Sequence, residues 1–339
     1  MDRPTIGIVA VGTYIPATHV TADQIATRTG IPEPVIREKF GLARKPVPGP
    51  ADHTNAMAVW AAQDALAAAG MRAGELDVVL CTTEEWKEYP LWTAGIALAH
   101  DLGATHAWAI DVQMRCATTV GALKLARALL IAEPAVRTVL IAGGYRNGDL
   151  VDYANPRTRF LINLSAGAGA LILRRGHPQN RLLGSALISD GAFSRDVIVP
   201  TGGTMAPNTA AILAAGGPYL DVPDPAGMKA RLDSLSMHNF IQVIDDALAA
   251  SGCTRADIGY LNILHMKRSA HDWVLRELGL RADQTVYLSD YGHIGQQDAM
   301  VSIKEGVAQG RLRDGTLMVI VAAGIGYAWG ASVVRWGSD

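Results

Sequence analysis

The sequence has few cysteines, no long apolar segment and no excess of charge of one sign, and each absence excludes a class of protein. The 339 residues include only three cysteines, Cys81, Cys116 and Cys253. A small, odd number of cysteines does not suit a disulfide framework, so we expect a reducing, cytoplasmic location. No apolar run is long enough to span a bilayer, and no signal-type segment opens the chain. Thirty Lys and Arg residues nearly balance 32 Asp and Glu residues, which argues against nucleic acid or a membrane as a partner.

Motifs for metals and dinucleotides are also missing. The nine histidines are scattered without an HExxH or CxxC pairing, and no GxGxxG follows the first strand-like run, so we expect neither a metal nor a bound cofactor. The chain instead alternates apolar, β-branched runs with alanine-rich stretches of helical spacing. This alternation predicts a mixed α/β fold with a largely buried sheet. The runs are TIGIVAVG, LDVVLCTT, AWAIDV, TVLIAGG, ALIL, YLNILH, TVYLS and LMVIVAAG.

An internal repeat divides the chain into two related halves. QDALAAAGMRAGELDVVLCTT (63–83) matches DDALAASGCTRADIGYLNILH (245–265) at an offset of 182, and RTVLIAGG matches LMVIVAAG at an offset of 180. We therefore predict two stacked halves, 1–175 and 236–339. The Gly- and Pro-rich segment between them, 176–235, is a predicted linker and a candidate lid. The offset of 182 also places Asp298 opposite Cys116.

Cys116 lies where a predicted strand, about 107–112, passes through a short turn into a helix. At the start of a helix, free backbone N–H groups and the positive end of the helix dipole stabilise a thiolate and so activate a nucleophile. The alternative is a buried cysteine that packs as a small apolar side chain. We keep that interpretation for Cys81 and Cys253, whereas the strand, turn and helix around Cys116 favour a nucleophile.

The stretch YGHIGQQDA (291–299) holds His293 and, five positions later, Asp298. These two residues can be a base and the carboxylate that orients it, completing with Cys116 a set of the triad kind. They can also belong to a helix-entry loop, in which the histidine caps or packs and the aspartate is an ordinary acid at a helix start.

Several motifs occur together in a characteristic order and spacing: DVQMRCATTVGAL, LNILHMKRSAHDWVLRELGL, YGHIGQQDAMVSIKEGVAQGRLRDG and AAGIGYAWGASVVRW. Together with TRTGIPEPVIREKFGLARK and SAGAGALIL, they resemble the ketoacyl synthase III family of the thiolase superfamily over essentially the whole chain. The resemblance implies a thiolase-like, five-layered αβαβα fold, a homodimer, and a cysteine acylated by a coenzyme A or carrier-protein thioester.

The resemblance also implies roles for individual residues. Cys116 matches the family's nucleophile and His265 its catalytic histidine, and the backbone N–H groups of Cys116 and Ile325 fall where the family has its oxyanion hole. His293 stands where the family has an asparagine that helps to hold the enolate formed by decarboxylation of a malonyl thioester. A histidine can accept a proton, which an amide cannot, so the change favours acyl transfer to a hydroxyl or amine, with Asp298 orienting the base.

The donor site departs from the family pattern. The tryptophan and arginine that stack the coenzyme A adenine correspond here to Val35 and Lys39, so either a carrier protein presents the pantetheine or coenzyme A is held differently. Lys267 and Arg268 are candidates to meet a phosphate or a malonyl carboxylate, and the alternative is solvated surface cations. Arg115 can pair with an acyl carboxylate or form structural hydrogen bonds.

Three functions remain open from the sequence. The first is an acyltransferase that moves a malonyl or other short acyl group through acyl-Cys116 to a hydroxyl, as on a sugar of a polyketide glycoside; here the chain resembles acyltransferases of polyketide pathways, of the cervimycin-type malonyltransferase kind. The second is decarboxylative condensation or starter-unit priming in polyketide or fatty acid synthesis. The third is a non-catalytic α/β protein with a decayed site, against which the retained nucleophile and base argue.

Overall fold

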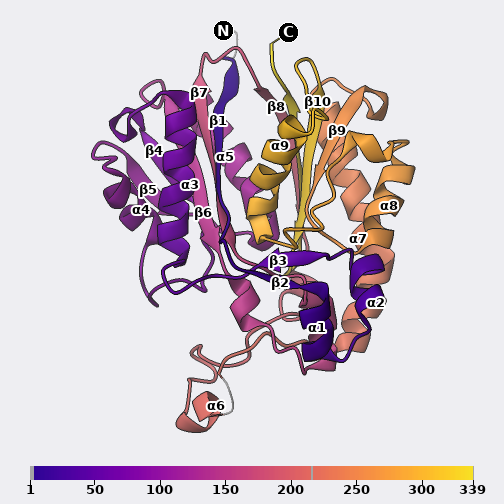
Figure 1. The fold of residues 1–339 in the computed structure, drawn as a ribbon. Helices are drawn as coiled ribbons and strands as arrows, with labels where there is room; N and C mark the ends of the chain where they lie inside the picture. The colour runs from indigo at the N-terminus through magenta and orange to yellow at the C-terminus, as the bar shows by residue number, and fades with distance from the viewer. Residues whose placement is uncertain (1–3, 215–216, 339) are drawn as a thin grey trace.

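A computed structural model describes residues 4–214 and 217–338 of the protein (Figure 1). The strands are β1 (Ile6–Tyr14), β2 (His19–Thr21), β3 (Arg44–Pro46), β4 (Val78–Cys81), β5 (Trp108–Asp111), β6 (Thr138–Tyr145), β7 (Gly167–Arg175), β8 (Arg181–Ser189), β9 (Ile258–Ile263), β10 (Leu317–Gly324) and β11 (Ala328–Arg335). The helices are α1 (Ala22–Thr29), α2 (Glu33–Glu38), α3 (Thr54–Ala69), α4 (Ala94–Leu102), α5 (Thr118–Ala132), α6 (Ala210–Ala214), α7 (Pro225–Ala249), α8 (Arg268–Glu277) and α9 (Asp298–Ala308). No helix in these ranges is both long and apolar enough to cross a membrane.

The main sheet has nine strands in the order β5-β4-β6-β7-β1-β8-β11-β10-β9. The first five belong to one half of the repeat and the last four to the other, and the halves meet where Gly7 of β1 pairs with Arg181 of β8. In each half two parallel neighbours, β4 with β6 and β9 with β10, are followed by antiparallel strands. The two halves therefore repeat one arrangement, as the sequence predicts.

Five layers result from the way the helices cover these half-sheets. Helices α3 and α4 pack on the outer face of the first half, α7 and α8 lie outside the second, and α5 and α9 occupy the space between them (Figure 1). This is the αβαβα arrangement expected of a thiolase-like fold, and the predicted fold class is confirmed.

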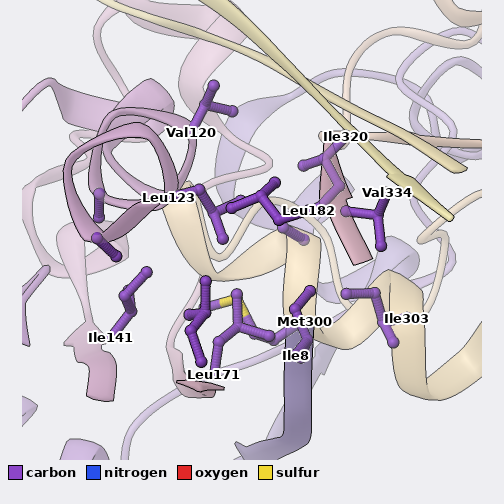
Figure 2. Packing of buried hydrophobic residues seen from close by; sticks show 14 of the residues in the cluster. Ile8, Val120, Leu123, Ile141, Leu171, Leu182, Met300, Ile303, Ile320 and Val334 are labelled. Carbon is purple, nitrogen blue, oxygen red and sulfur yellow. The ribbon is translucent and has the colours of Figure 1, made fainter. Parts of the chain in front are cut away.

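The central layer holds a large apolar core (Figure 2). Val120 and Leu123 of α5 and Met300 and Ile303 of α9 are almost fully buried there, against strand residues such as Ile8. Burying each such side chain contributes roughly 1.5–3 kcal/mol. Because α5 and α9 are enclosed between the half-sheets, their amino-terminal ends occupy fixed positions. Cys116, His293 and Asp298 lie at or just before those ends, whereas His265 follows β9.

Two expectations about the elements need correction. TVYLS was expected to be a strand, but its residues form only an isolated bridge between Thr285 and Leu261 before the chain leaves the sheet. Part of the predicted linker is regular structure, since β8 lies within 176–235 and α7 begins at Pro225. The remaining connection includes α6, which projects from the body of the molecule (Figure 1).

Candidate active site

The turn that holds Cys116, the predicted nucleophile, lies between β5 and α5 and is called the nucleophile turn. Cys116 is the central residue of a one-turn 3₁₀ helix, η2 (Arg115–Ala117), and α5 begins two residues later. Arg115 has a left-handed backbone, with φ of 52°, which reverses the chain just before the cysteine. The end of β10 approaches this turn so closely that a Cβ atom on Gly324 would lie 3.0 Å from the backbone nitrogen of Cys116. The absence of a side chain at Gly324 therefore lets the two halves meet at the nucleophile.

Cys116, His293 and Asp298 form one continuous chain of hydrogen bonds. His293 Nε2 lies 3.1 Å from Cys116 Sγ, and its Nδ1 lies 2.6 Å from Asp298 Oδ2. The histidine and the aspartate are buried, with 6% and 2% of their surfaces exposed. Because the carboxylate accepts a hydrogen bond from Nδ1–H, Nε2 is the nitrogen that can exchange a proton with the thiol.

Asp298 has further partners, which lock its position. Its Oδ1 accepts a hydrogen bond from the backbone N–H of Ile294, and its Oδ2 also accepts one from the backbone N–H of His265. The helix-entry interpretation is thus also correct in part: Asp298 is the first residue of α9 and caps the turn before it, and the same carboxylate orients His293.

His265 lines the same cavity, but its ring nitrogens have other partners. Nδ1 lies 2.9 Å from Asn163 Nδ2, and Nε2 lies 3.3 Å from the Gly41 carbonyl. The Asn163 carbonyl in turn accepts the backbone N–H of His293 at 2.8 Å. Asn163 therefore connects the two histidines, and a catalytic role for His265 stays a prediction.

The pKa values of the two histidines shift in opposite directions. Burial lowers the pKa of His265 to about 4, and the nearby Asp298 opposes this shift only in part. Burial also lowers the pKa of His293, but the negative charges and hydrogen bonds of Asp298 and Cys116 raise it well above its ordinary value. The two imidazoles of the site therefore have pKa values on opposite sides of the ordinary value, a separation that is typical of acid and base pairs.

A cavity of about 570 Å³ opens over Cys116. Much of its wall is apolar, including Phe40, Phe160, Met228 and Phe240. Met228 and Phe240 come from α7, and Leu220 joins them from the segment before it, so the predicted lid segment does contribute to the cavity.

The structure brings some of the predicted binding residues to this cavity. Lys267 lines it, with Nζ 5.7 Å from the centre of the Phe40 ring. Arg115 also lines it, but its guanidinium binds the carboxylate of Glu85. Ile325, in the turn after β10, reaches the cavity as expected, and the role of its N–H as an oxyanion donor stays a prediction.

Two predicted residues lie elsewhere. Lys39 is exposed at the end of α2. Arg268 stacks over Tyr287, 4.5 Å from the ring centre, and its Nε lies 3.5 Å from Asp272, beside a different cavity. The donor-binding role assigned to these two residues remains without a structural link to Cys116.

Sequence reasoning missed many residues of the cavity, and those nearest to the predicted catalytic residues include Asn163, Tyr145 and Glu84. Asn163 and Tyr145 carry no local signal, because their contacts join segments far apart in the chain. Glu84 did carry one: it is an acidic residue directly after a buried strand, and the repeat offset places it opposite Met266, which also lines the cavity.

Comparison with known proteins places this site in a family. The sequence model described as 3-oxoacyl-[acyl-carrier-protein (ACP)] synthase III matches residues 110–191, and its C-terminal counterpart matches residues 248–336. Together they cover just over half of the chain and include Cys116, His293 and Asp298. The chain belongs to the ketoacyl synthase III family. It is therefore an enzyme of acyl-transferring or condensing chemistry.

A curated member of the family is similar over its full length. The β-ketoacyl-[acyl-carrier-protein] synthase III of Rhodospirillum centenum is 29% identical over 335 residues, which are 97% of this chain and 98% of the relative. Two solved structures share the fold. A priming β-ketosynthase of a polyketide biosynthetic pathway has a TM-score of 0.84 at 21% identity, covering 100% of this chain and 98% of its own. The acyltransferase ChlB3 has a TM-score of 0.82 at 24% identity, covering 99% and 98%.

Proposed function

We propose that this ketoacyl synthase III family member is a thioester-dependent acyltransferase that moves a short acyl group to a hydroxyl through acyl-Cys116. The observation that carries the proposal is the hydrogen-bonded sequence Cys116, His293, Asp298, with distances of 3.1 and 2.6 Å. The finer expectations also belong to it: a malonyl group, a coenzyme A or carrier-protein donor, and a sugar hydroxyl of a polyketide glycoside as acceptor, as in cervimycin-type assembly.

In the first half-reaction the Cys116 thiolate attacks the thioester carbon, and the new carbon–sulfur bond forms as the bond to the carrier sulfur breaks. His293, protonated by the thiol, gives its proton to the departing carrier thiolate. Acylation removes the negative charge on Cys116, which is one of the causes that raise the pKa of His293. The neutral imidazole can then act as a base.

In the second half-reaction the acceptor hydroxyl gives its proton to His293 Nε2 while its oxygen attacks the acyl carbon. The bond to Cys116 breaks, and the thiolate is restored beside the imidazolium. Asp298 stabilises that imidazolium throughout, because its carboxylate stays bonded to Nδ1. A base placed in this way contributes roughly 10²- to 10⁴-fold to the rate.

The second candidate is decarboxylative condensation or priming, and the names of the relatives favour it over transfer to a sugar. Condensation needs hydrogen-bond donors for an enolate oxygen. The neutral His265 and the Asn163 amide can supply them once they give up their present hydrogen bonds to each other and to Gly41. The geometry at His293 favours transfer, because a carboxylate-bound imidazole accepts a proton that the family's amide does not.

Malonyl-coenzyme A labelled in its free carboxyl carbon separates the two functions. Transfer and hydrolysis release coenzyme A and keep the label in the product, whereas condensation with acetyl-coenzyme A releases labelled carbon dioxide. We expect label on Cys116, none on Cys116→Ala, and coenzyme A release without carbon dioxide when methyl glucoside is offered as a hydroxyl acceptor.

His293→Asn restores the amide of the family and is the diagnostic variant. We expect the transfer rate to fall by about 10²- to 10⁴-fold and the ratio of carbon dioxide to coenzyme A to rise. Carbon dioxide release matching coenzyme A release in the unmodified enzyme would establish condensation instead.

A further inference from the structure

Glu84 is a buried acid on the floor of the cavity, and it has no role in the acyl transfer proposed above. It follows β4, is 3% exposed, and lines the cavity together with Cys116 and Tyr145. Its Oε2 accepts a hydrogen bond from Asn147 Nδ2 at 2.7 Å. Its Oε1 has no hydrogen-bond partner among the described residues. A buried polar atom left unpaired is costly, so this oxygen marks a place for a ligand.

The charges around Glu84 set its protonation. Burial raises the pKa of this carboxyl, and the guanidinium of Arg115, whose Nη1 lies 3.9 Å from Oε2, only partly opposes the shift. The same guanidinium binds Glu85 much more closely. Because Oε2 already accepts a hydrogen bond, a proton held by this carboxyl lies on Oε1, from which it can donate to a ligand atom.

The position of Glu84 indicates which part of a substrate it meets. The mouth of the cavity is marked by the charged lining residues that are exposed, namely Arg157, Lys229, Asp233 and Lys267. Glu84, Tyr145 and His293 are buried and form the floor. A carrier that enters through the mouth brings its thioester to Cys116, so the acyl chain beyond the thioester lies over the floor.

From these contacts we infer that Glu84 selects the acyl group that Cys116 accepts: a short chain whose far end carries a hydrogen-bond acceptor such as a hydroxyl, carbonyl or carboxylate. The inference rests on the proposed acyl-Cys116 intermediate. An aliphatic chain of the same size would cover Oε1 and exclude water from it without offering a partner. Sites built to pair a buried polar group discriminate strongly against analogues that cannot pair with it.

Two thioesters of equal size test the selection. 3-Hydroxypropionyl-coenzyme A and butyryl-coenzyme A differ only in a terminal hydroxyl in place of a methyl group. The rate of acyl-Cys116 formation, measured by intact-mass spectrometry after rapid quenching, should favour the hydroxyacyl group by roughly 10- to 100-fold. Malonyl-coenzyme A and 3-methylbutyryl-coenzyme A form a second matched pair, in which a carboxylate replaces an isopropyl group.

Variants at Glu84 connect the preference to this residue. Glu84→Gln keeps a neutral hydrogen-bonding side chain of the same shape and should retain the preference for 3-hydroxypropionyl within about threefold. Glu84→Leu removes the polar atoms at similar volume and should abolish or reverse it. Glu38→Leu is the control, because it removes an exposed acid of α2 that does not line the cavity, and it should leave the ratio unchanged.

The outcomes separate this inference from the proposed function. If the wild-type enzyme labels Cys116 with butyryl as fast as with 3-hydroxypropionyl, the role of Glu84 is overturned, whereas the proposed acyl-Cys116 intermediate stands. This test does not depend on whether Glu84→Leu folds. The same conclusion follows if a folded Glu84→Leu keeps the wild-type ratio. Failure of every thioester to label Cys116 overturns both.

Discussion

At the scale of single residues, Asp298 is the group on which both histidines depend. One carboxylate oxygen bonds His293 Nδ1 and the backbone N–H of His265. It raises the pKa of each, but for His265 burial outweighs it. The separation between the two pKa values thus arises from distance and burial around a single acid.

Replacing Asp298 by Asn should lower the transfer rate and shift its pH dependence. The amide cannot hold the Nδ1 proton in the same way, so we expect the plateau rate to fall by about 10²- to 10⁴-fold. Transfer from acyl-Cys116 needs neutral His293, so its rate rises with pH through the pKa of that residue, which Asp298 still raises after acylation. Loss of the carboxylate charge lowers this pKa, so the rising limb should move to lower pH. A pH profile of deacylation measures both effects, and an unshifted limb would contradict the role of Asp298.

Lys45 predicts a pH-dependent stability unrelated to catalysis. It is 1% exposed, its Nζ donates to the carbonyls of Ile162 and Leu164, and burial lowers its pKa to about 7 from 10.5. Between these two values the unfolded chain binds a proton that the folded chain has released, so stability should rise with pH by at most about 1.4 kcal/mol per unit.

Urea unfolding of the wild type and of Lys45→Met between pH 7 and 10 tests this expectation. The methionine variant has nothing to titrate at this position, so its stability should lack the slope. If the free energy of unfolding rises with pH equally in the two proteins, Lys45 is not the cause of the pH dependence.

The residues of the site differ in how far the sequence could predict them. His293 and Asp298 were predictable because they lie five positions apart at a helix start. The contacts of Asn163 were not, because they join residue 163 to residues 265 and 293 through the folding of three separate segments. The sequence shows Glu84 as an acid that follows a strand. It does not show that Oε1 is buried without a hydrogen-bond partner, because this depends on how the chain packs.

At the scale of elements, the contact between β10 and the nucleophile turn is the tightest constraint on the site. A Cβ atom on Gly324 would overlap the Met114 carbonyl as well as crowd the nitrogen of Cys116. We expect Gly324→Ala to cost about 1–3 kcal/mol of stability through overpacking. We expect it to slow acylation by roughly 10²-fold, because small displacements of reacting groups are expensive.

Thermal unfolding and the rate of Cys116 labelling measure the two effects of this variant separately. Gly74, at which an added Cβ meets nothing within 4 Å, offers Gly74→Ala as the matched control. Normal labelling in a folded Gly324→Ala enzyme would show that the turn does not depend on β10.

The elements themselves were predictable where an unbroken apolar run forms a buried parallel strand, as in β4 and β6. β8 was harder to recognise because Gly184 and Ser185 interrupt the apolar run RLLGSALIS. Both residues are explained by contacts with segments distant in the sequence. Ser185 hydrogen bonds Ser332 of β11, and a Cβ atom on Gly184 would crowd Ser251. TVYLS failed for the opposite reason: Val286 and Leu288 are buried without being part of a strand.

At the scale of the whole molecule, one end of the sheet is poorly covered. β5 is the terminal strand, and Trp108 and Ile110 on it are 43% and 37% exposed. Large exposed apolar side chains gather in the neighbouring sequence, namely Trp86, Tyr89, Leu91 and Ile96. An exposed edge strand beside such side chains favours association, so a second copy of this chain, the homodimer expected from the family resemblance, is our proposal for this face.

Light scattering after gel filtration tests the dimer. The wild type should have twice the mass of the chain at micromolar concentration, and Trp108→Lys combined with Ile110→Lys should be monomeric. Leu213→Lys, on the projecting α6, controls for the loss of an exposed apolar side chain and should remain dimeric. A monomeric wild type would exclude the proposal.

The division of the site between two pseudo-repeated halves bears on how the enzyme folds. Cys116 belongs to the first half, whereas His293 and Asp298 belong to the second, and contacts between segments this distant in sequence form slowly. Helical signals can therefore recover while the thiol still lacks its imidazole. During refolding, we expect rapid alkylation of Cys116 by iodoacetamide at neutral pH only after His293 has docked beside it. The alkylation rate of this thiol then reports the last step of assembly.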